Sequence, residues 1–342
     1  MAIVTHESAQ GVPQGRPQTA VQVVAPAPAG MVPASGSLPI SHVTAEIRAD
    51  GRPTPEFRQI LRRIPSWRNA GSVVLLYGQT AAVLWLAVRF GPWSWPVCFL
   101  MMGRAHAQFA SLMHEAAHRL LFSNRKLNDG VGRWLLGYPA FASTDAYRRV
   151  HMAHHRQEFG PEEPDVPLYR GYPITPASLR RKLWRDARGS TALKLFKAQA
   201  SGFRSPNAKV RHTLYEIVLV QVALLGSAIA VGHWWLYPLF WVAPYMTVWR
   251  VINRLRSIAE HGGMMASKDR RETTHSVRQH APAKFVMVPY NIGFHLAHHV
   301  DSGIPFRNLP RYHRALRAAG YVTDATEYGS YALIWRALQT TS

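Results

Sequence analysis

Two long stretches that are almost free of charged residues constrain the fold of this 342-residue chain more than any other feature. The first covers residues 72–113 and is interrupted by a Gly-Pro pair at 91–92, and the second covers residues 213–249 with a break at 232–233. A helix needs about 20 residues to cross the apolar part of a membrane, so each stretch is long enough for two crossings joined by a tight turn. The sequence therefore predicts an all-α integral membrane protein with four transmembrane helices in two hairpins, near residues 72–90, 93–113, 214–231 and 234–252.

The basic residues are distributed unevenly around these stretches. The chain has 40 Lys and Arg against 19 Asp and Glu, a formal net charge of +21. Almost none of the Lys and Arg lies at the two predicted turns, whereas they are frequent in residues 58–68, 180–211 and 250–271. Because Lys and Arg are enriched in cytoplasmic loops, we expect a multi-pass protein with both termini and the central loop in the cytoplasm. Aromatic residues typical of a membrane interface gather at the opposite ends, namely Trp93, Trp95, Trp234, Trp235 and Tyr237.

Other classes of protein explain only part of this pattern. Nucleic-acid binding accounts for the net charge but does not require long uncharged apolar stretches, so no nucleic-acid partner is expected. A soluble protein with two buried helical hairpins stays an alternative. The chain has a single cysteine, Cys98, which excludes a disulfide scaffold and any cysteine-rich zinc or iron–sulfur site.

The N-terminal residues differ in composition from the remainder. Residues 1–56 are rich in Pro, Ala, Val, Gln and Gly and show no hydrophobic period. Such a composition is typical of a disordered segment, because it offers no face to bury. We therefore expect a disordered tail over residues 1–56, followed by one membrane domain over residues 57–342.

Three histidine clusters follow or flank the predicted spans: His114-Glu-Ala-Ala-His118, His151-Met-Ala-His154-His155 and His295-Leu-Ala-His298-His299. Residues at positions i, i+3 and i+4 share one face of a helix. Imidazole is the commonest metal ligand, and three such faces can surround a metal centre without any carboxylate. Two His-x-x-His-His clusters are expected by chance on the order of once in a thousand such chains. The clusters therefore predict a histidine-ligated metal site.

Two other metal chemistries match parts of this pattern. Residues 114–118 fit the H-E-x-x-H of zinc proteases, with Glu115 as base, but that interpretation leaves six other clustered histidines without a role. A carboxylate-bridged di-iron bundle needs two E-x-x-H motifs, and Glu115 to His118 and Glu272 to His275 both fit. The second of these lacks an apolar stripe that would face a bundle core. An intramembrane metalloprotease remains a distant alternative.

The three clusters, split between two predicted hairpins, resemble the histidine boxes of the integral-membrane fatty acid desaturase family, which includes related hydroxylases and ketolases. The resemblance covers residues 58–338 and extends to Glu163-Pro-Asp165 after the second box and to residues 303–310 after the third. It implies four transmembrane helices under a helical cytosolic cap, in which two irons are bound by the eight box histidines and one more. His261 occupies the place of that additional histidine, and Ser257 stands where some members have an Asn. The implied metal-binding and catalytic residues are His114, His118, His151, His154, His155, His261, His295, His298 and His299.

The resemblance also implies an activity. We expect an O2-dependent oxidase, with its active site on the cytoplasmic side, that introduces a double bond into an acyl chain of a fatty acid or lipid. A hydroxylase or ketolase acting on a lipid, a carotenoid or a small molecule is the alternative. Such a reaction consumes two electrons, and the chain contains no flavin, haem or iron–sulfur motif. We therefore expect a separate electron donor of the ferredoxin or cytochrome b5 type at the basic cytosolic face, beside membrane lipids.

Several other polar residues have more modest predicted roles. Glu115 and Asp165 are expected to accept hydrogen bonds from ligand imidazoles and so to orient them. For Asp165, a loop carboxylate paired with a nearby arginine is an equal alternative. Arg104 lies inside a predicted span and is expected either to stabilise the structure or to contact a substrate headgroup. His106, in the same span, is expected to pack against a neighbouring helix or to support the metal ligands. The remaining histidines are expected at the surface, namely His212, His233, His275, His280 and His313.

Overall fold

The computed structural model describes residues 31–34, 36–160, 163 and 165–340, and helices form most of this part of the chain. The α-helices are α1 (Pro55–Leu61), α2 (Ser66–Phe90), α3 (Trp95–Ala117), α4 (Arg125–Gly130), α5 (Thr144–Arg156), α6 (Val166–Tyr169), α7 (Pro176–Ala187), α8 (Ser190–Ser201), α9 (Ala208–Ala230), α10 (Ala243–Met246), α11 (Val248–His261), α12 (Ala281–Val286), α13 (His295–Val300), α14 (Leu309–Ala318) and α15 (Tyr331–Ala337). Short 3₁₀ segments are η1 (Gly91–Trp93), η3 (Gly202–Arg204), η5 (Arg270–Glu272) and η6 (Pro289–Asn291), and π-helical segments are η2 (Val131–Gly137) and η4 (Tyr237–Val242). Two strands of two residues, β1 (Ser276–Val277) and β2 (Glu327–Tyr328), pair in parallel. The prediction of a mainly helical protein is confirmed.

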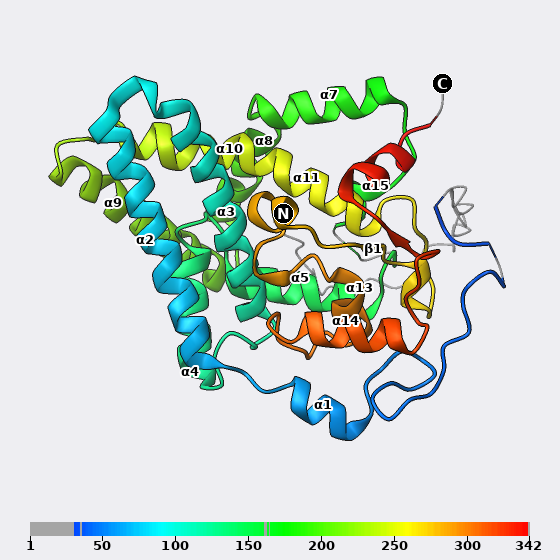
Figure 1. Ribbon diagram of the computed structural model, residues 1–342. Helices are drawn as coiled ribbons and strands as arrows, with labels where there is room; N and C mark the ends of the chain where they lie inside the picture. Colours follow the sequence, from blue (N-terminus) through cyan, green and yellow to red (C-terminus); the bar gives the residue numbers. More distant parts are fainter. Residues whose placement is uncertain (1–30, 35, 161–162, 164, 341–342) are drawn as a thin grey trace, which may run out of the picture.

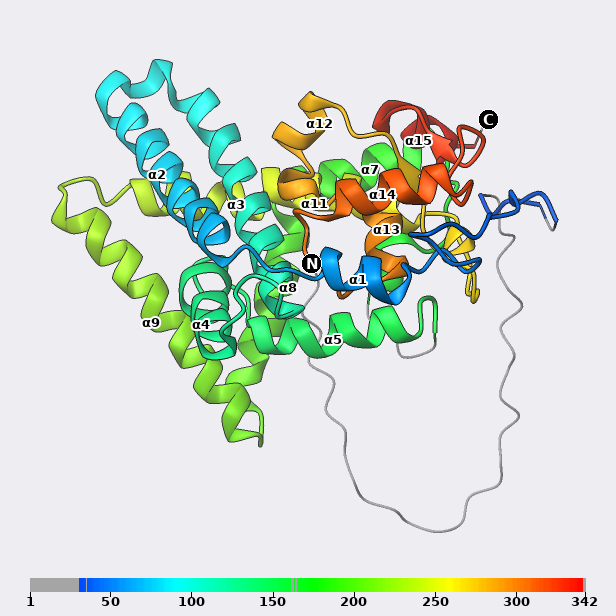
Figure 2. The ribbon, with the colours of Figure 1, turned by 60° about the horizontal axis from the view of Figure 1, so that its bottom comes forward.

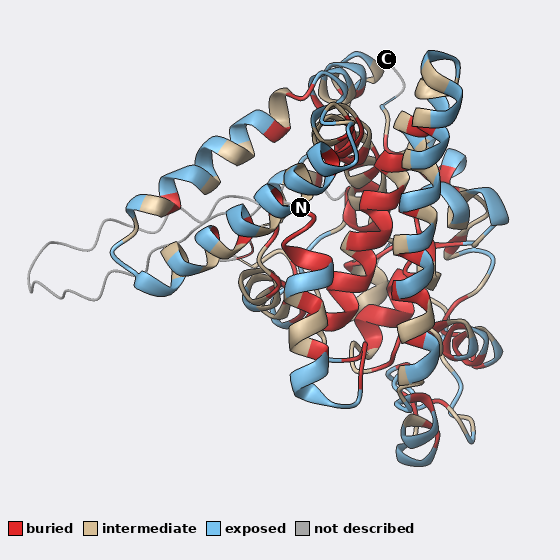
Figure 3. Ribbon diagram, turned by 90° about the vertical axis from the view of Figure 1, so that its left-hand side faces the viewer, coloured by how far each residue is buried: buried red, intermediate tan, exposed pale blue. Residues whose placement is uncertain are grey.

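Within the described residues, two helices are long and apolar enough to cross a membrane, Ser66–Trp93, which joins α2 to η1, and Ala208–Ala230, which is α9. Both lie at the left of the molecule in Figure 1, and in Figure 2 α9 diverges from the other helices whereas α2 runs beside α3. Apolar side chains on both are exposed, among them Val74 and Leu75 on α2 and Leu219 on α9. Figure 3 shows the same contrast, because the buried residues concentrate in the central helices and the outlying ones are largely exposed. Exposed apolar surface of this kind indicates a membrane-facing or partner-facing side.

Helix α3 is the central element of the fold. It follows α2 through the tight turn at η1, where Gly91 adopts a positive φ of 62° that a residue with a side chain rarely takes. From Met102 to Ala117, nearly every residue of α3 is buried, and the helix packs against α2, α5 and α11. Buried polar residues such as His106 and Gln108 make α3 less apolar than α2, in keeping with its interior position.

The predicted fourth span, residues 234–252, is not one continuous helix. The structure divides it into η4, α10 and the first turn of α11. Proline cannot donate a backbone hydrogen bond and disturbs the preceding turn, and Pro238 and Pro244 lie in the first turns of η4 and α10. The backbone at Thr247 then leaves the helical region before α11 begins. The apolar composition predicted helical structure in this region, but the two prolines determine where the helix is interrupted.

The prediction of a disordered tail is wrong for the part that the structure describes. Residues 31–34 and 36–56 run along the folded domain, and the side chain of Ile47 is fully buried. The hydroxyl of Tyr312 on α14 donates to the carbonyl of Gly51, 2.8 Å away, and Ile47 forms a bridge with Pro53. Tyr312 lies 261 residues from Gly51 in the sequence, so a local pattern does not reveal this contact. The prediction for residues 1–30 lies outside the described residues.

Candidate metal centre

Four helices bring the nine predicted histidines together. His114 lies in the last turn of α3 with His118 directly after it, α5 carries three histidines, His261 is the last residue of α11, and α13 carries three. Eight of the nine side chains are buried, and His118 is partly buried. Helix α5 begins where the Ser143 side chain accepts a hydrogen bond from the amide of Ala146, an arrangement that satisfies a free amide at the start of the helix. The histidines therefore lie on or directly beside four helices, at the ends of α3 and α11 and within α5 and α13.

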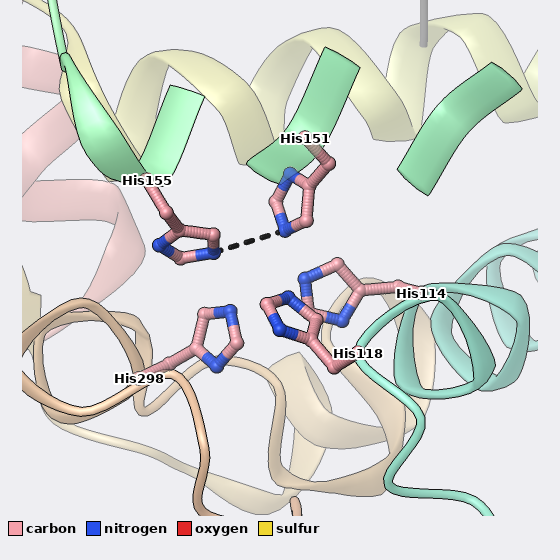
Figure 4. A group of neighbouring side chains, drawn as sticks. All are labelled: His114, His118, His151, His155 and His298. Carbon is pink, nitrogen blue, oxygen red and sulfur yellow. Dashed lines mark hydrogen bonds between the residues drawn. The ribbon is translucent and has the colours of Figure 1, made fainter. Parts of the chain in front are cut away.

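Five of the histidines form the first group, and each offers one ring nitrogen within 4.8 Å of the others. Figure 4 shows that their rings point into a common space from α3, α5 and α13. The Nε2 atoms of His151 and His155 are 3.1 Å apart. The group consists of His114, His118, His151, His155 and His298.

The second group lies beside the first and contains four histidines. One ring nitrogen each of His154, His261 and His299 lies within 4.8 Å of the others. The Nε2 atom of His295 is 3.0 Å from Nε2 of His261 and 3.0 Å from Nε2 of His299. The structure thus arranges the nine predicted residues in a set of five and a set of four, and a third candidate group, His155, Glu158 and His299, joins the two sets.

The chemistry of these groups fits metal binding. Several buried ring nitrogens have no hydrogen-bond partner in the described part of the chain, including both nitrogens of His114 and Nε2 of His118 and His298. A buried polar atom without a partner costs about 1–3 kcal/mol, and a metal ion would satisfy these nitrogens at once. Burial lowers the pKa of His118 to about 3. Burial, together with neighbouring imidazoles, also lowers the pKa of His298 well below its ordinary value. Neutral imidazoles keep the lone pair that a metal requires.

Carboxylates and a carbonyl hold the outer nitrogens of the second group. Nδ1 of His299 lies 2.5 Å from Oε1 of Glu158, and Nδ1 of His154 contacts the carboxylate of Glu163. Nδ1 of His261 donates to the carbonyl of Thr273 at 2.9 Å. Such partners fix which ring nitrogen carries the proton and leave Nε2 directed at the centre.

The sequence predicted that Glu115 and Asp165, rather than Glu158 and Glu163, would orient the ligand imidazoles. Glu115 instead accepts a hydrogen bond from the backbone amide of Phe306 at 3.0 Å, and it therefore ties α3 to the segment before α14. Asp165 makes no side-chain hydrogen bond within the described residues and lines a cavity. The orientation prediction is wrong for both. The signal for Glu158 was its position three residues after the second box, but spacing alone did not separate it from a surface loop residue.

The second E-x-x-H motif does not reach the centre. The side chain of Glu272 accepts a hydrogen bond from Ser267 at 2.5 Å, and Nε2 of His275 lies 2.7 Å from the carbonyl of Gly262. This geometry excludes Glu272 and His275 as ligands of either group. Glu115, engaged with the amide of Phe306, is likewise not placed as the base of a zinc protease.

The other singled-out residues have structural positions. His275 and His313 were predicted at the surface, but both are buried, and His313 pairs with Glu327 at 2.9 Å.

Two polar residues of α3 contact neighbouring segments. Nε2 of His106 lies 2.9 Å from the carbonyl of Trp241, so its role is packing between helices. Arg104 donates to the carbonyl of Phe285 at 2.5 Å, which holds α12 against α3. His212 and His280 are exposed, as predicted, and His233 is partly exposed.

Comparison with known proteins agrees with this geometry. The model of the fatty acid desaturase family matches residues 90–329, which include all nine histidines. The chain therefore belongs to the fatty acid desaturase family and is an oxidoreductase. It is also 25% identical over 253 residues to the dihydrorhizobitoxine desaturase of Bradyrhizobium elkanii, a match that covers 69% of this chain and 72% of that protein.

Proposed function

We propose that this protein is an integral membrane desaturase that depends on O2 and on two bound irons. The observation that carries the proposal is the pair of buried histidine groups, five imidazoles in one and four beside it, with carboxylates such as Glu158 on outer ring nitrogens. Histidines 114, 118, 151, 155 and 298 would bind one iron, and histidines 154, 261, 295 and 299 the other. Bound iron would supply the chemistry that reduces O2 and attacks an unactivated C–H bond, which acids, bases and nucleophiles leave intact.

The reaction consumes O2, two electrons and two protons and removes one hydrogen from each of two neighbouring carbons. The products are a carbon–carbon double bond and two molecules of water. The protein holds the reacting carbons beside the histidine groups and excludes bulk water, because both groups are buried. The electrons come from a separate acidic donor, of the ferredoxin or cytochrome b5 type, attracted by the net charge of +21.

The membrane arrangement that we propose has four crossings in two hairpins, with the histidine groups and both termini on the cytoplasmic side. The apolar surfaces of α2 and α9 support two of the crossings. The distal ends of the two hairpins meet, because the rings of Trp95 and Trp235 lie 5.2 Å apart. Trp93 and Trp234 are exposed at these ends, where an aromatic belt of a membrane protein would lie.

Mass spectrometry of the product tests the proposed reaction. Purified, iron-loaded protein receives reductant, O2 and extracts of the host lipids and metabolites. We expect a product that is lighter by two hydrogens, and we expect none without O2 or in the His298→Ala variant. A product heavier by one oxygen from ¹⁸O2 would make the enzyme a hydroxylase. Turnover that persists without O2 would instead support the metalloprotease alternative.

A further inference from the structure

The cavity beside the histidine groups has an unusual lining for an enzyme of acyl chains. Its volume is about 60 Å³, and five of the nine histidines form part of its wall. The remaining wall includes Asp165, Arg256 and Glu260, the tyrosines Tyr147 and Tyr169, and apolar residues such as Leu168 and Trp249. Charged residues therefore line the same cavity as histidines that would bind metal.

Several of these groups have unused hydrogen-bonding capacity. Arg256 donates through Nε to Glu260 at 2.6 Å, and its two terminal nitrogens have no partner among the described residues. The carboxylate of Asp165 has none either within the described part of the chain. Tyr169 is only 2% exposed, and its buried hydroxyl also has no hydrogen-bond partner in the described part of the chain. An acyl chain would cover these groups without satisfying them, at a cost of roughly 1–3 kcal/mol for each.

The size of the cavity also disfavours an acyl chain as its occupant. A water molecule needs about 10–15 Å³ of such volume, so about 60 Å³ holds only a few small groups. A second cavity of about 340 Å³ has an almost wholly apolar lining, with Ile252, Leu255, Val286 and Trp335 in its wall. That volume suits an acyl chain, but none of the nine histidines lines it. The apolar space and the histidine groups are therefore separate.

We propose that the substrate is a small zwitterion, of the amino-acid type, with a short apolar chain. Its carboxylate binds the terminal nitrogens of Arg256, and its ammonium group binds Asp165. A bidentate contact between a guanidinium and a carboxylate is strong and directional, so it fixes which carbons face the histidines. The assignment of these carbons as the reacting ones rests on the proposed function, whereas the binding of the zwitterion does not.

The test measures binding without turnover. Full-length protein in detergent, loaded with redox-inactive Zn²⁺, is titrated calorimetrically with L-norleucine, hexanoate, hexylamine and palmitate. Norleucine carries both charges, and the two six-carbon analogues carry one each. We expect norleucine to bind at least tenfold more tightly than either analogue or palmitate. Asp165→Asn should abolish this advantage over hexanoate, and Arg256→Gln should abolish it over hexylamine.

Matched variants separate recognition from folding. Asp165 makes no side-chain hydrogen bond in the described structure, so Asp165→Asn is expected to fold. Arg256→Lys should keep part of the affinity that Arg256→Gln loses. Asp324→Asn, at a carboxylate that is 78% exposed, is the control and should bind norleucine like the wild type.

The outcomes separate this inference from the proposed function. Equal or tighter binding of hexanoate or palmitate, or unchanged norleucine binding in Asp165→Asn, would overturn the inference whatever the activity. A norleucine advantage that Asp165→Asn and Arg256→Gln both keep reports chelation of the zinc by the amino acid and overturns it. An advantage that each of these variants removes supports it, even if no double bond forms in any substrate. In that case the desaturase proposal fails and the substrate class stands.

Discussion

At the residue scale, the positions of the histidine rings depend on the side chains that contact their outer ring nitrogens. Glu158 is the clearest case, because one oxygen, Oε1, lies 2.5 Å from Nδ1 of His299 and accepts a hydrogen bond from Arg270 at 2.5 Å. Arg270 also donates to the carbonyl of His155 at 2.9 Å. A single ion pair thus positions histidines on α5 and α13.

Replacing Glu158 by Gln is therefore expected to weaken metal binding. The amide can still accept from His299, but it no longer carries the charge that balances Arg270. Loss of such an outer partner typically costs 10- to 100-fold in metal affinity or activity. Metal content after dialysis against a graded chelator measures the effect. The control is Glu46→Gln, at a carboxylate that is 47% exposed. Equal retention of metal by Glu158→Gln and the wild type would contradict the positioning role.

A second carboxylate predicts how stability depends on pH. Glu327 is 2.9 Å from Nε2 of His313 and 2.6 Å from Nη1 of Arg317, and it accepts from Ser276 at 3.0 Å. Burial alone would raise the pKa of Glu327, but these partners together lower it. A carboxylate with a lowered pKa stabilises the fold above its unfolded pKa, about 4.3, and this contribution is lost as the pH falls through the folded value.

We accordingly expect Glu327→Gln to destabilise the protein by about 2 kcal/mol at pH 7. The difference from the wild type should shrink as the pH falls below about 4, where the wild-type carboxylate becomes protonated. Thermal unfolding in detergent between pH 3.5 and 7 measures both. Asp324→Asn, with an exposed carboxylate in the same cluster, should show a much smaller difference. A constant difference across the range would contradict this account.

At the element scale, helical spacing predicted part of the centre. Positions four apart share a face, and His151 and His155 do belong to one group, as do His114 and His118. Spacing did not predict that His154 belongs to the other group, because that depends on the rotation of α5 relative to α11 and α13. The same limit applies to the contact between Gly51 and Tyr312, which are distant in the sequence. The fourth predicted span is a different case, because Pro238 and Pro244 are visible in the sequence and the prediction gave them too little weight. The resemblance to a family, rather than spacing, pointed to His261.

The contact between α3 and α11 gives a prediction about packing. A Cβ at Gly103 would lie 2.3 Å from Cγ1 of Val248, far closer than two carbon atoms approach. Gly103→Ala should therefore destabilise the protein by roughly 1–3 kcal/mol, and adding Val248→Ala should recover most of this loss. Thermal stability in detergent of the two single variants and the double variant tests the coupling. Gly78→Ala is the control, because no atom lies within 4 Å of its added Cβ.

At the scale of the whole molecule, the proposed membrane orientation predicts which surfaces face which side. Trp93, at the end of the first hairpin, is 95% exposed, and Trp184 on the basic helix α7 is 65% exposed. A cysteine at each position, in a Cys98→Ala background, reports its side through a membrane-impermeant maleimide. Intact cells should label Trp93→Cys and leave Trp184→Cys unlabelled until the membrane is permeabilised. Labelling of Trp184→Cys in intact cells would contradict the orientation.

Neighbouring residues that serve different groups have a consequence for metal loading. His154 and His155 are adjacent in α5 but belong to separate groups, as do His298 and His299 in α13. An ion in one group therefore fixes the helices that carry ligands of the other, and by reciprocity each ion strengthens the binding of its neighbour. Loading should be cooperative. Native mass spectrometry during a zinc titration should show chains with no metal or two metals, and few chains with one.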